Sequence, residues 1–317
     1  MKLKKLALGL ATALVLSSFA ACAGDSQKLA FNDYWELNSL TTSSSINETL
    51  EYKVTHEKGS GLDAINYTLT YGVGSYVTNL KTDIQGYIYT TTLTMPVTFQ
   101  YGDEVESVTD TVTTEVIFAR SKDGLRPISS KKNVVSHTPQ NVGASSLKTC
   151  YSLYDFSVVT TYPEEGKATS IATYQQAEGE PIELTSTFTA SDKNYSYLDN
   201  EQLLLALRAI SPSVSSGSVK IYNPFVESKQ KINFSFSDET GAKFSYTFNG
   251  EPTEKDITYR PVSLTIDDRN PGGTQTAWIA KRGTADNNVD RNVMLKLTVP
   301  LSYSFGYLVY DLVSIAR

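Results

Sequence analysis

The sequence predicts a mainly β protein, in which a long, curved antiparallel sheet (a half-barrel) wraps around one short buried helix near residues 199–210. From Glu48 onward, apolar side chains recur at every second position, and the positions between them are mainly Thr, Ser, Lys and Asn. This is the pattern of strands with one buried and one solvated face. One segment breaks this period and is apolar nearly all round, so as a helix it has to be buried.

The start of the chain is typical of an export signal. Three lysines lie within the first five residues, and an apolar run over residues 6–16, too short to span a bilayer, is followed by small residues. Phe19-Ala-Ala-Cys22 resembles the lipobox of bacterial lipoproteins. The resemblance implies that residues 1–21 are a lipoprotein signal peptide and that Cys22 carries the lipid anchor at a bacterial membrane, outside the cytoplasm. The alternative is a plain signal peptide cut nearby, with Cys22 incidental.

The charge and the cysteines narrow the choice of partners. The chain has 28 Lys and Arg against 34 Asp and Glu, a formal net charge of −6, and removal of residues 1–21 would make it more acidic. Nucleic acids and anionic lipid surfaces bind clustered Lys and Arg, so we expect no nucleic-acid partner. With Cys22 lipidated, Cys150 has no cysteine to pair with. We interpret Cys150 as a small packed side chain in a strand.

Behind the anchor, residues 22–46 are rich in Ser, Thr, Asn and Asp and predict a polar tether. Residues 47–317 then form a single β-rich domain. Strands are predicted where the alternation is clearest: Leu50–Val54, Ile65–Val73, Val112–Phe118, Tyr154–Val158, Ile232–Phe236 and Phe244–Phe248. Most of the 20 tyrosines are in phase with Val, Leu and Phe, which favours a place in the core over a ligand groove.

The C-terminal part has the longest alternation, from Val293 to Val309 at odd positions, with Pro300 and Gly306 inside it. Proline cannot donate a backbone hydrogen bond and glycine permits sharp bending. We therefore predict either one long, strongly curved strand or two strands joined at Pro300. The phase of the alternation also changes around Pro261, which predicts a bulge.

The helix has its own start and stop signals. Asp199 is a helix N-cap, Gln202 completes a capping box, and Ser211-Pro212 ends the segment. The simplest place for this helix is inside the curved sheet.

Two short motifs carry a family resemblance. Asn47-Glu-Thr-Leu-Glu-Tyr-Lys-Val54 is similar to a Gly-Glu-x-Leu-x-Tyr-x-Val pattern, with Asn47 in place of Gly. Tyr197, Asp199 and Leu207-Arg208 are similar to an aromatic residue, an Asp and a leucine-rich helix ending in Leu-Arg. Both patterns belong to an uncharacterised family of bacterial envelope proteins that resembles the half-barrel lipoprotein carriers LolA and LolB. The resemblance implies carriage of a lipid or an acylated protein.

The census of reactive residues predicts no enzyme, no cofactor and no metal site. The two histidines, His56 and His137, are far apart in the sequence, and no catalytic or nucleotide-binding motif occurs. We interpret His56 as a partly exposed structural histidine and Asp103–Asp110 as a solvated turn that leads into a strand. Asp267 and Asp268 lie in a segment of turn-forming composition and would matter for catalysis if they lay beside a histidine.

The predicted function is therefore a membrane-anchored lipoprotein that binds a hydrophobic ligand, a lipid or an acylated protein, in the concave face of the sheet. This hypothesis predicts an apolar cavity beside the helix at residues 199–210, and the sequence does not assign its ligand-binding residues. The alternative is a non-catalytic interaction or scaffolding module of the cell envelope with a sealed core.

Overall fold

The computed structural model describes residues 46–119, 125–141, 143–176, 179–191, 196–211, 213–224, 227–266, 274–281 and 292–317. The predicted lipid anchor Cys22, the signal peptide, and the tether up to residue 45 lie outside these ranges, as do Asp267 and Asp268. In the described ranges no helix has the length and apolar character needed to cross a membrane.

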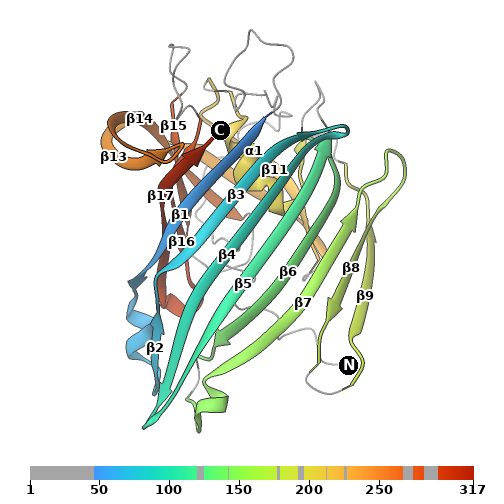
Figure 1. Cartoon of the computed structure of the whole chain (residues 1–317). Helices are drawn as coiled ribbons and strands as arrows, with labels where there is room; N and C mark the ends of the chain where they lie inside the picture. The colour runs from blue at the N-terminus through green and yellow to red at the C-terminus, as the bar shows by residue number, and fades with distance from the viewer. Residues whose placement is uncertain are drawn as a thin grey trace.

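Most of the described chain belongs to one β-sheet (Figure 1). The strands are β1 (Asn47–Lys58), β2 (Thr68–Tyr71), β3 (Gly74–Asp83), β4 (Gly86–Tyr101), β5 (Glu104–Ala119), β6 (Pro127–Pro139), β7 (Tyr151–Thr161), β8 (Ala168–Tyr174), β9 (Ile182–Phe188), β10 (Ser196–Tyr197), β11 (Ser216–Asn223), β12 (Ser228–Phe236), β13 (Thr240–Phe248), β14 (Glu251–Ile266), β15 (Gln275–Ala280), β16 (Met294–Pro300) and β17 (Gly306–Ala316). The helical elements are short: the 3-10 turns η2 (Ser60–Asp63), η3 (Leu147–Thr149), η4 (Asn200–Gln202) and η5 (Ser302–Ser304), and the helix α1 (Leu203–Arg208).

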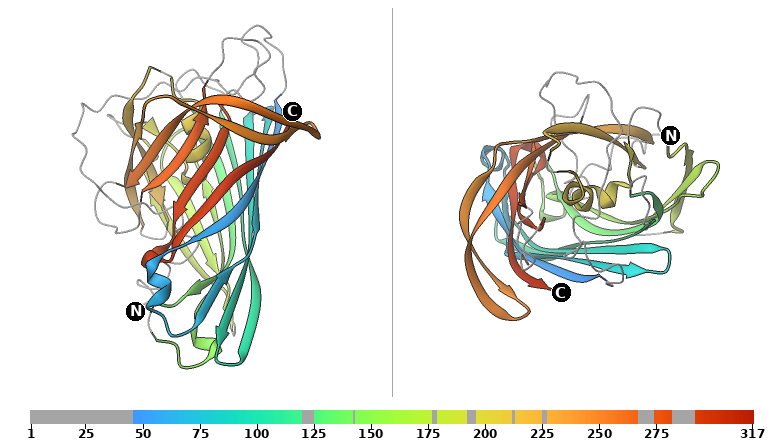
Figure 2. Two further views of the ribbon diagram at one scale, coloured as in Figure 1. Left: turned by 90° about the vertical axis from the view of Figure 1, so that its left-hand side faces the viewer. Right: turned by 90° about the horizontal axis from the view of Figure 1, so that it is seen from above.

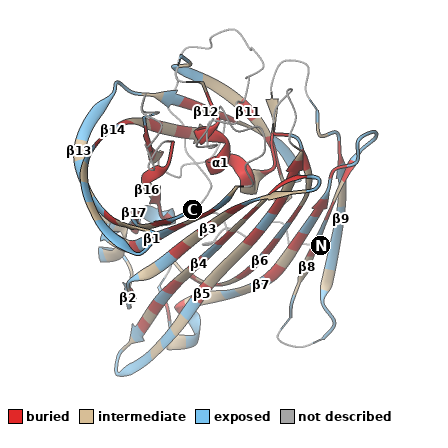
Figure 3. Cartoon of the chain, turned by 45° about the horizontal axis from the view of Figure 1, so that its top comes forward, coloured by how far each residue is buried: buried red, intermediate tan, exposed pale blue. Residues whose placement is uncertain are grey.

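The strands form one long curved sheet around α1. Hydrogen-bonded neighbours run in the order β9, β8, β7, β6, β5, β4, β3, β1, β17, β16, β15, β14, β12, β11 and β10. Along this path every pairing is antiparallel except the short one between β10 and β11. From above, the sheet curves around α1 (Figure 2), and α1 is buried on its concave side (Figure 3). The predicted mainly β fold around one short buried helix is confirmed.

A small closed barrel is built into the larger sheet. Strand β13 pairs with β14 and also, in parallel, with β17, so β13, β14, β15, β16 and β17 form a closed circuit. Strand β14 serves both structures because its partner changes near Pro261, from β13 over residues 251–259 to β12 over residues 262–266. The phase change predicted there is present, but the predicted bulge is not: the register of β14 with β15 runs unbroken past Pro261.

The two ends of the large sheet meet through aromatic side chains. Phe188 of β9 stacks on Tyr222 of β11, with ring centroids 3.7 Å apart and planes 8° apart. Tyr162 and Tyr197 complete this group, which we call the seam. No strand pairing joins β9 to β11 within the described residues, so ring packing rather than a backbone ladder holds the edges together.

The strand predictions are confirmed where the alternation is regular and wrong where a turn resets it. Leu50, Tyr52 and Val54 of β1 are all buried, as expected. In contrast, the strand predicted over Ile65–Val73 is only the four residues of β2. It stops because three residues, 72–74, lie opposite two in β4, and this irregularity leaves Val73 64 % exposed.

The C-terminal segment forms two strands, β16 and β17, which is one of the two predicted alternatives. The face that its odd-numbered residues occupy changes between the two strands. In β16 the odd positions are buried, whereas in β17 Tyr307 is 43 % exposed and Leu308 and Tyr310 are in the core. The turn η5 resets the phase, and Gly306 makes this possible. It has φ +116°, and a Cβ at this position would collide with the carbonyl oxygen of Glu57 in β1.

The α-helix itself is shorter than the predicted 199–210, because the first turn of the segment is the 3-10 turn η4 and α1 ends at Arg208. The predicted capping box is present: the Asp199 carboxylate accepts from the backbone N–H of Glu201, and the Gln202 side chain accepts from the backbone N–H of Asp199. All six side chains of α1 are buried, including Arg208. The helix thus fills the concave face, as its composition predicts.

Candidate functional site

A cavity of about 70 Å³ lies between the start of the helical segment and the concave face of the sheet. Part of its wall is apolar, from strands that are distant in the sequence: Leu93 on β4, Val112 on β5, Leu204 on α1, and Leu297 and Val299 on β16. These positions face inward because each lies in the buried phase of its strand or on the buried helix. The cavity is therefore beside the helix, where the ligand-binding hypothesis expects one.

The other part of the cavity wall is polar and includes an ion pair. Lys132 Nζ of β6 lies 3.0 Å from Glu201 Oε1 of η4, and the two side chains are only 6 % and 10 % exposed. The hydroxyl groups of Thr91 and Thr114 share a hydrogen bond of 2.7 Å. Thr91, Thr114 and Lys132 lie in the inward phase of their strands, where apolar side chains are the usual occupants. The sheet therefore presents a mixed surface to the helix at this point.

Among the described residues, Gln275 is the polar residue of the cavity wall whose side chain makes no hydrogen bond. Its side chain is fully buried, yet within the described residues neither its amide oxygen nor its amide nitrogen makes a hydrogen bond. A buried amide usually has its hydrogen bonds satisfied, because leaving them unmade costs free energy. This residue, the first of β15, is thus an exception that calls for a partner.

The start of the helical segment is tied to the sheet by Asp199. Its Oδ2 accepts hydrogen bonds from the Ser130 hydroxyl at 2.6 Å and the Tyr162 hydroxyl at 2.5 Å. Burial, followed by the nearby carboxylate of Glu201, raises the pKa of Asp199 above its usual value, and these hydrogen bonds oppose the rise. Because Tyr162 is part of the seam, the same carboxylate links the helix start to the line where the sheet edges meet.

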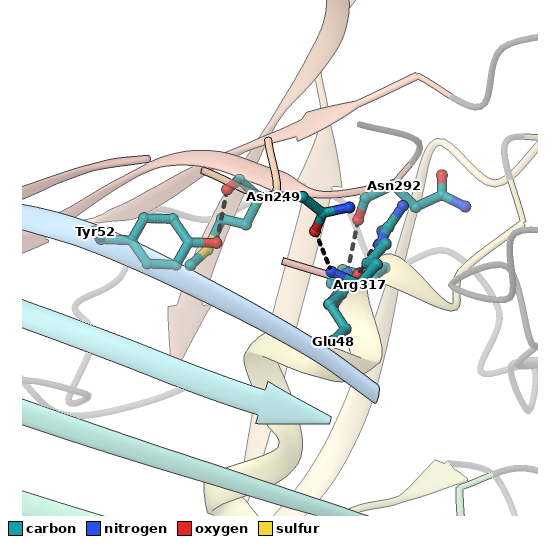
Figure 4. Close-up of polar contacts among 7 residues, drawn as sticks. Glu48, Tyr52, Asn249, Asn292 and Arg317 are labelled. Carbon is teal, nitrogen blue, oxygen red and sulfur yellow. Dashed lines mark hydrogen bonds and ion pairs between the residues drawn. The ribbon is translucent and has the colours of Figure 1, made fainter. Parts of the chain in front are cut away.

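The other end of the helix is held by a buried charge cluster (Figure 4). Arg208 Nη1 and Nη2 donate to the two carboxylate oxygens of Glu48 at 2.7 and 3.0 Å, and Arg208 Nε donates to the carbonyl oxygen of Asn292 at 2.7 Å. Arg317 also pairs with Glu48. Burial alone would raise the pKa of Glu48, but the two arginines outweigh it and lower this pKa to about 2.

This cluster joins the two motifs that carried the family resemblance. Glu48 belongs to the segment 47–54, and Arg208 ends the leucine-rich helix, 160 positions later in the sequence. The motifs therefore mark the two halves of one buried ion pair. In the sequence, Glu48 is in phase with the buried Leu50, Tyr52 and Val54. A charged residue in this phase was the signal that could have indicated a buried ion pair.

The histidines lie apart, in environments that sequence reasoning described only in part. His137 Nδ1 lies 2.8 Å from Asp110 Oδ1, and burial raises the pKa of Asp110 above its usual value. The interpretation of Asp103–Asp110 as solvated is therefore wrong for its last residue, which is 1 % exposed because it lies in the inward phase of β5. His56 is partly buried, and its Nε2 lies 2.9 Å from the carbonyl oxygen of Phe305.

Cys150 is a buried thiol, and burial raises its pKa. The prediction that Cys150 lies in a strand is wrong. It lies directly after η3 and before β7, where its backbone N–H donates to the carbonyl oxygen of Leu147. Within the described residues, no group of three or more His, Cys, Asp and Glu side chains is arranged to hold a metal ion.

Comparison with known proteins adds a structural similarity. No family model matches the chain, and no curated protein matches it. The chain is similar to a beta-barrel-like protein of the domain of unknown function DUF1849 from Brucella abortus, known from a crystal structure. The match has a TM-score of 0.45 and 10 % sequence identity, and it covers 85 % of this chain and 97 % of that one.

Proposed function

We propose that this chain is a lipoprotein, held outside the cytoplasm at a bacterial membrane by a lipid on Cys22, that binds a hydrophobic ligand between α1 and the sheet. The ligand class is a lipid or an acylated protein. The observation that carries the proposal is the cavity beside the helix, whose apolar wall is formed by Leu93, Leu204 and Leu297 among others. Sites that bury small apolar ligands combine such a wall with a few polar groups.

The volume of the cavity limits how the ligand enters. At about 70 Å³ it is smaller than the roughly 150 Å³ apolar cavity that admits benzene. The closed form therefore has room for one end of a ligand, and a longer chain requires the sheet to widen. The seam is the favoured place for widening, because β9 and β11 meet there through rings such as Phe188 and Tyr222 and not through a backbone ladder among the described residues.

Native mass spectrometry and solvent extraction of the full chain, purified from membranes in mild detergent, test ligand binding. We expect a lipid or an acylated molecule to co-purify with the wild type and to be lost from Val112→Phe, which fills the cavity. Val159→Phe is the matched control, because Val159 is 42 % exposed and does not line the cavity. Wild-type protein without any bound molecule would refute the ligand proposal.

The anchor is tested separately by the mass of the mature N-terminus. We expect an acylated N-terminal peptide that begins at Cys22, and release of the protein from the membrane in Cys22→Ser. A mature chain that begins elsewhere, without acylation, would refute the anchor and leave the ligand proposal standing.

A second function, a scaffolding module with a sealed core, is favoured by one observation. Both ends of the helical segment are fixed by buried hydrogen bonds, through Asp199 at one end and Arg208 at the other, so the helix serves as a rigid filler of the sheet. In this case function lies on the Thr-rich convex face. Two results together would support the scaffold. Added hydrophobic molecules would leave the melting temperatures of wild type and Val112→Phe unchanged, and no molecule would co-purify with the wild type.

A further inference from the structure

Gln275 carries the further inference because it lines the cavity and its buried amide makes no hydrogen bond among the described residues. The carboxamide has one oxygen that accepts and one nitrogen that donates two hydrogen bonds. A group that satisfies both sides at once must itself offer a donor and an acceptor. A carboxamide, including a peptide group, has this pairing.

The charges around the cavity favour a neutral guest. Lys132 and Glu201 both line it, and they pair with each other at 3.0 Å, so they leave no net charge to offset an ionised group. Burial of an unpaired carboxylate or ammonium in such a place is expensive. A free fatty acid in its ionised form is therefore disfavoured, and a neutral amide is not.

The size of the cavity agrees with a small head group. A volume of about 70 Å³ holds a few heavy atoms, so an amide fits beside Gln275 with only the first carbons of the attached chain along Leu204 and the Leu297–Val299 face, and the rest of the chain requires the sheet to widen. The polar and apolar parts of the wall then each meet the matching part of one ligand.

We propose that Gln275 binds the neutral carboxamide group of an acyl-amide ligand, and that this group occupies the cavity between α1 and the sheet. The inference rests on the proposed ligand-binding function and names the ligand class. It makes Gln275 a specificity residue, which discriminates an amide from a carboxylate on the same chain.

Titration calorimetry with two probes, hexanamide and hexanoate, tests the inference at pH 7 on the full chain. We expect hexanamide to bind the wild type about tenfold or more tightly than hexanoate, since a site that hydrogen-bonds a polar group rejects an analogue that does not pair with it. Gln275→Met, which keeps the size of the side chain, loses the affinity for hexanamide by about tenfold or more. Gln100→Met, at an exposed position on β4, leaves it unchanged.

The outcomes separate the two proposals. Equal hexanamide affinity in wild type and Gln275→Met, or tighter binding of hexanoate than of hexanamide, overturns the role of Gln275. The ligand-binding proposal still stands in that case if a lipid co-purifies with the wild type. If neither probe binds and no molecule co-purifies, both proposals fall. As a control, the melting temperature of Gln275→Met is compared with that of the wild type, so that a loss of binding can be distinguished from a loss of fold.

Discussion

The two ends of the buried helical segment are built on different principles. At the far end, Arg208 is bonded to Glu48 and to the backbone, and Arg317 completes the cluster. At the near end, Lys132 and Glu201 form one pair beside a cavity, and Gln275 has no partner within the described residues. Both ends are tied to the sheet, the near end through Asp199. The difference indicates that the far end is packed around its ion pairs, whereas the near end also keeps a cavity and an unused amide.

The strongest test of this difference is Arg208→Met. The substitution leaves the buried Glu48 with Arg317 as its remaining cation, and breaking a buried ion pair typically costs about 3–5 kcal/mol. We expect a loss of that order in the free energy of unfolding, measured in urea. The double variant Arg208→Met with Glu48→Leu should recover only part of it, because it removes the buried carboxylate but also takes away the Glu48 ion-pair partner of Arg317. A loss below about 1 kcal/mol would contradict the fixing role.

The two ends should also respond to acid in opposite directions. The pKa of Glu48 is lowered to about 2 in the folded chain, so its contribution is present above the ordinary glutamate pKa and is lost as the pH falls from about 4.5 towards 2. The shift corresponds to stability on the order of 3 kcal/mol. The pKa of Asp199 is raised, so its contribution is present at low pH and is lost as the pH rises through the raised value.

Unfolding free energies of Glu48→Gln and Asp199→Asn across pH 2–7 measure these two effects. In Glu48→Gln the free energy of unfolding should fall less steeply than in the wild type as the pH falls from about 4.5 to 2. In Asp199→Asn it should no longer show the small increase that acidification gives the wild type. Parallel pH curves for wild type and Glu48→Gln would show that Glu48 is not the group that titrates.

At the near end, Lys132→Met should have a smaller effect than Arg208→Met. Glu201 keeps a hydrogen bond from the Asn200 amide at 2.8 Å, and the cavity gives water access to the carboxylate. We expect a loss of about 1–2 kcal/mol in the free energy of unfolding. A loss as large as that of Arg208→Met would show that the two ends are equally rigid.

The smallest effect is expected from Gln275→Met in the ligand-free chain. Replacing a buried amide without hydrogen bonds by an apolar group of similar size should leave stability unchanged or raise it by about 1 kcal/mol. Thermal unfolding checks this. A clear destabilisation would mean that the amide has a partner in the free protein, such as ordered water.

Local signals in the sequence predicted more of the fold than of the candidate site. The capping box at Asp199 and the buried phase of Leu50, Tyr52 and Val54 depend on neighbours a few positions away, so both could be predicted. The cavity depends on strands that meet only through sheet order, and Gln275 opens a six-residue strand whose alternation, with Ala277 and Ile279, was not recognised. Lys132 did leave a trace, because it is in phase with the buried Val134.

The phase reversal after Gly306 shows the limit of periodicity as a guide. The odd positions from Val293 to Val309 form an unbroken apolar pattern, yet the backbone turns at Tyr303 and Ser304 with positive φ and exchanges the two faces. Val309 is buried like its even-numbered neighbours Leu308 and Tyr310, so apolar residues on both faces hid the exchange.

The pairing of β1 with β17 sets the order in which this protein can reach its native state. The register joins Thr49 to Ala316, and Arg317 reaches Glu48 across 269 positions. Contacts between such distant segments make folding slow compared with helical proteins, because a long loop closes before the contact gains any free energy. During synthesis the hairpins β3–β9 can assemble early, but β1 keeps an open edge until β17 arrives. The buried charge cluster at Arg208 is complete only when the end of β17 brings Arg317 to Glu48.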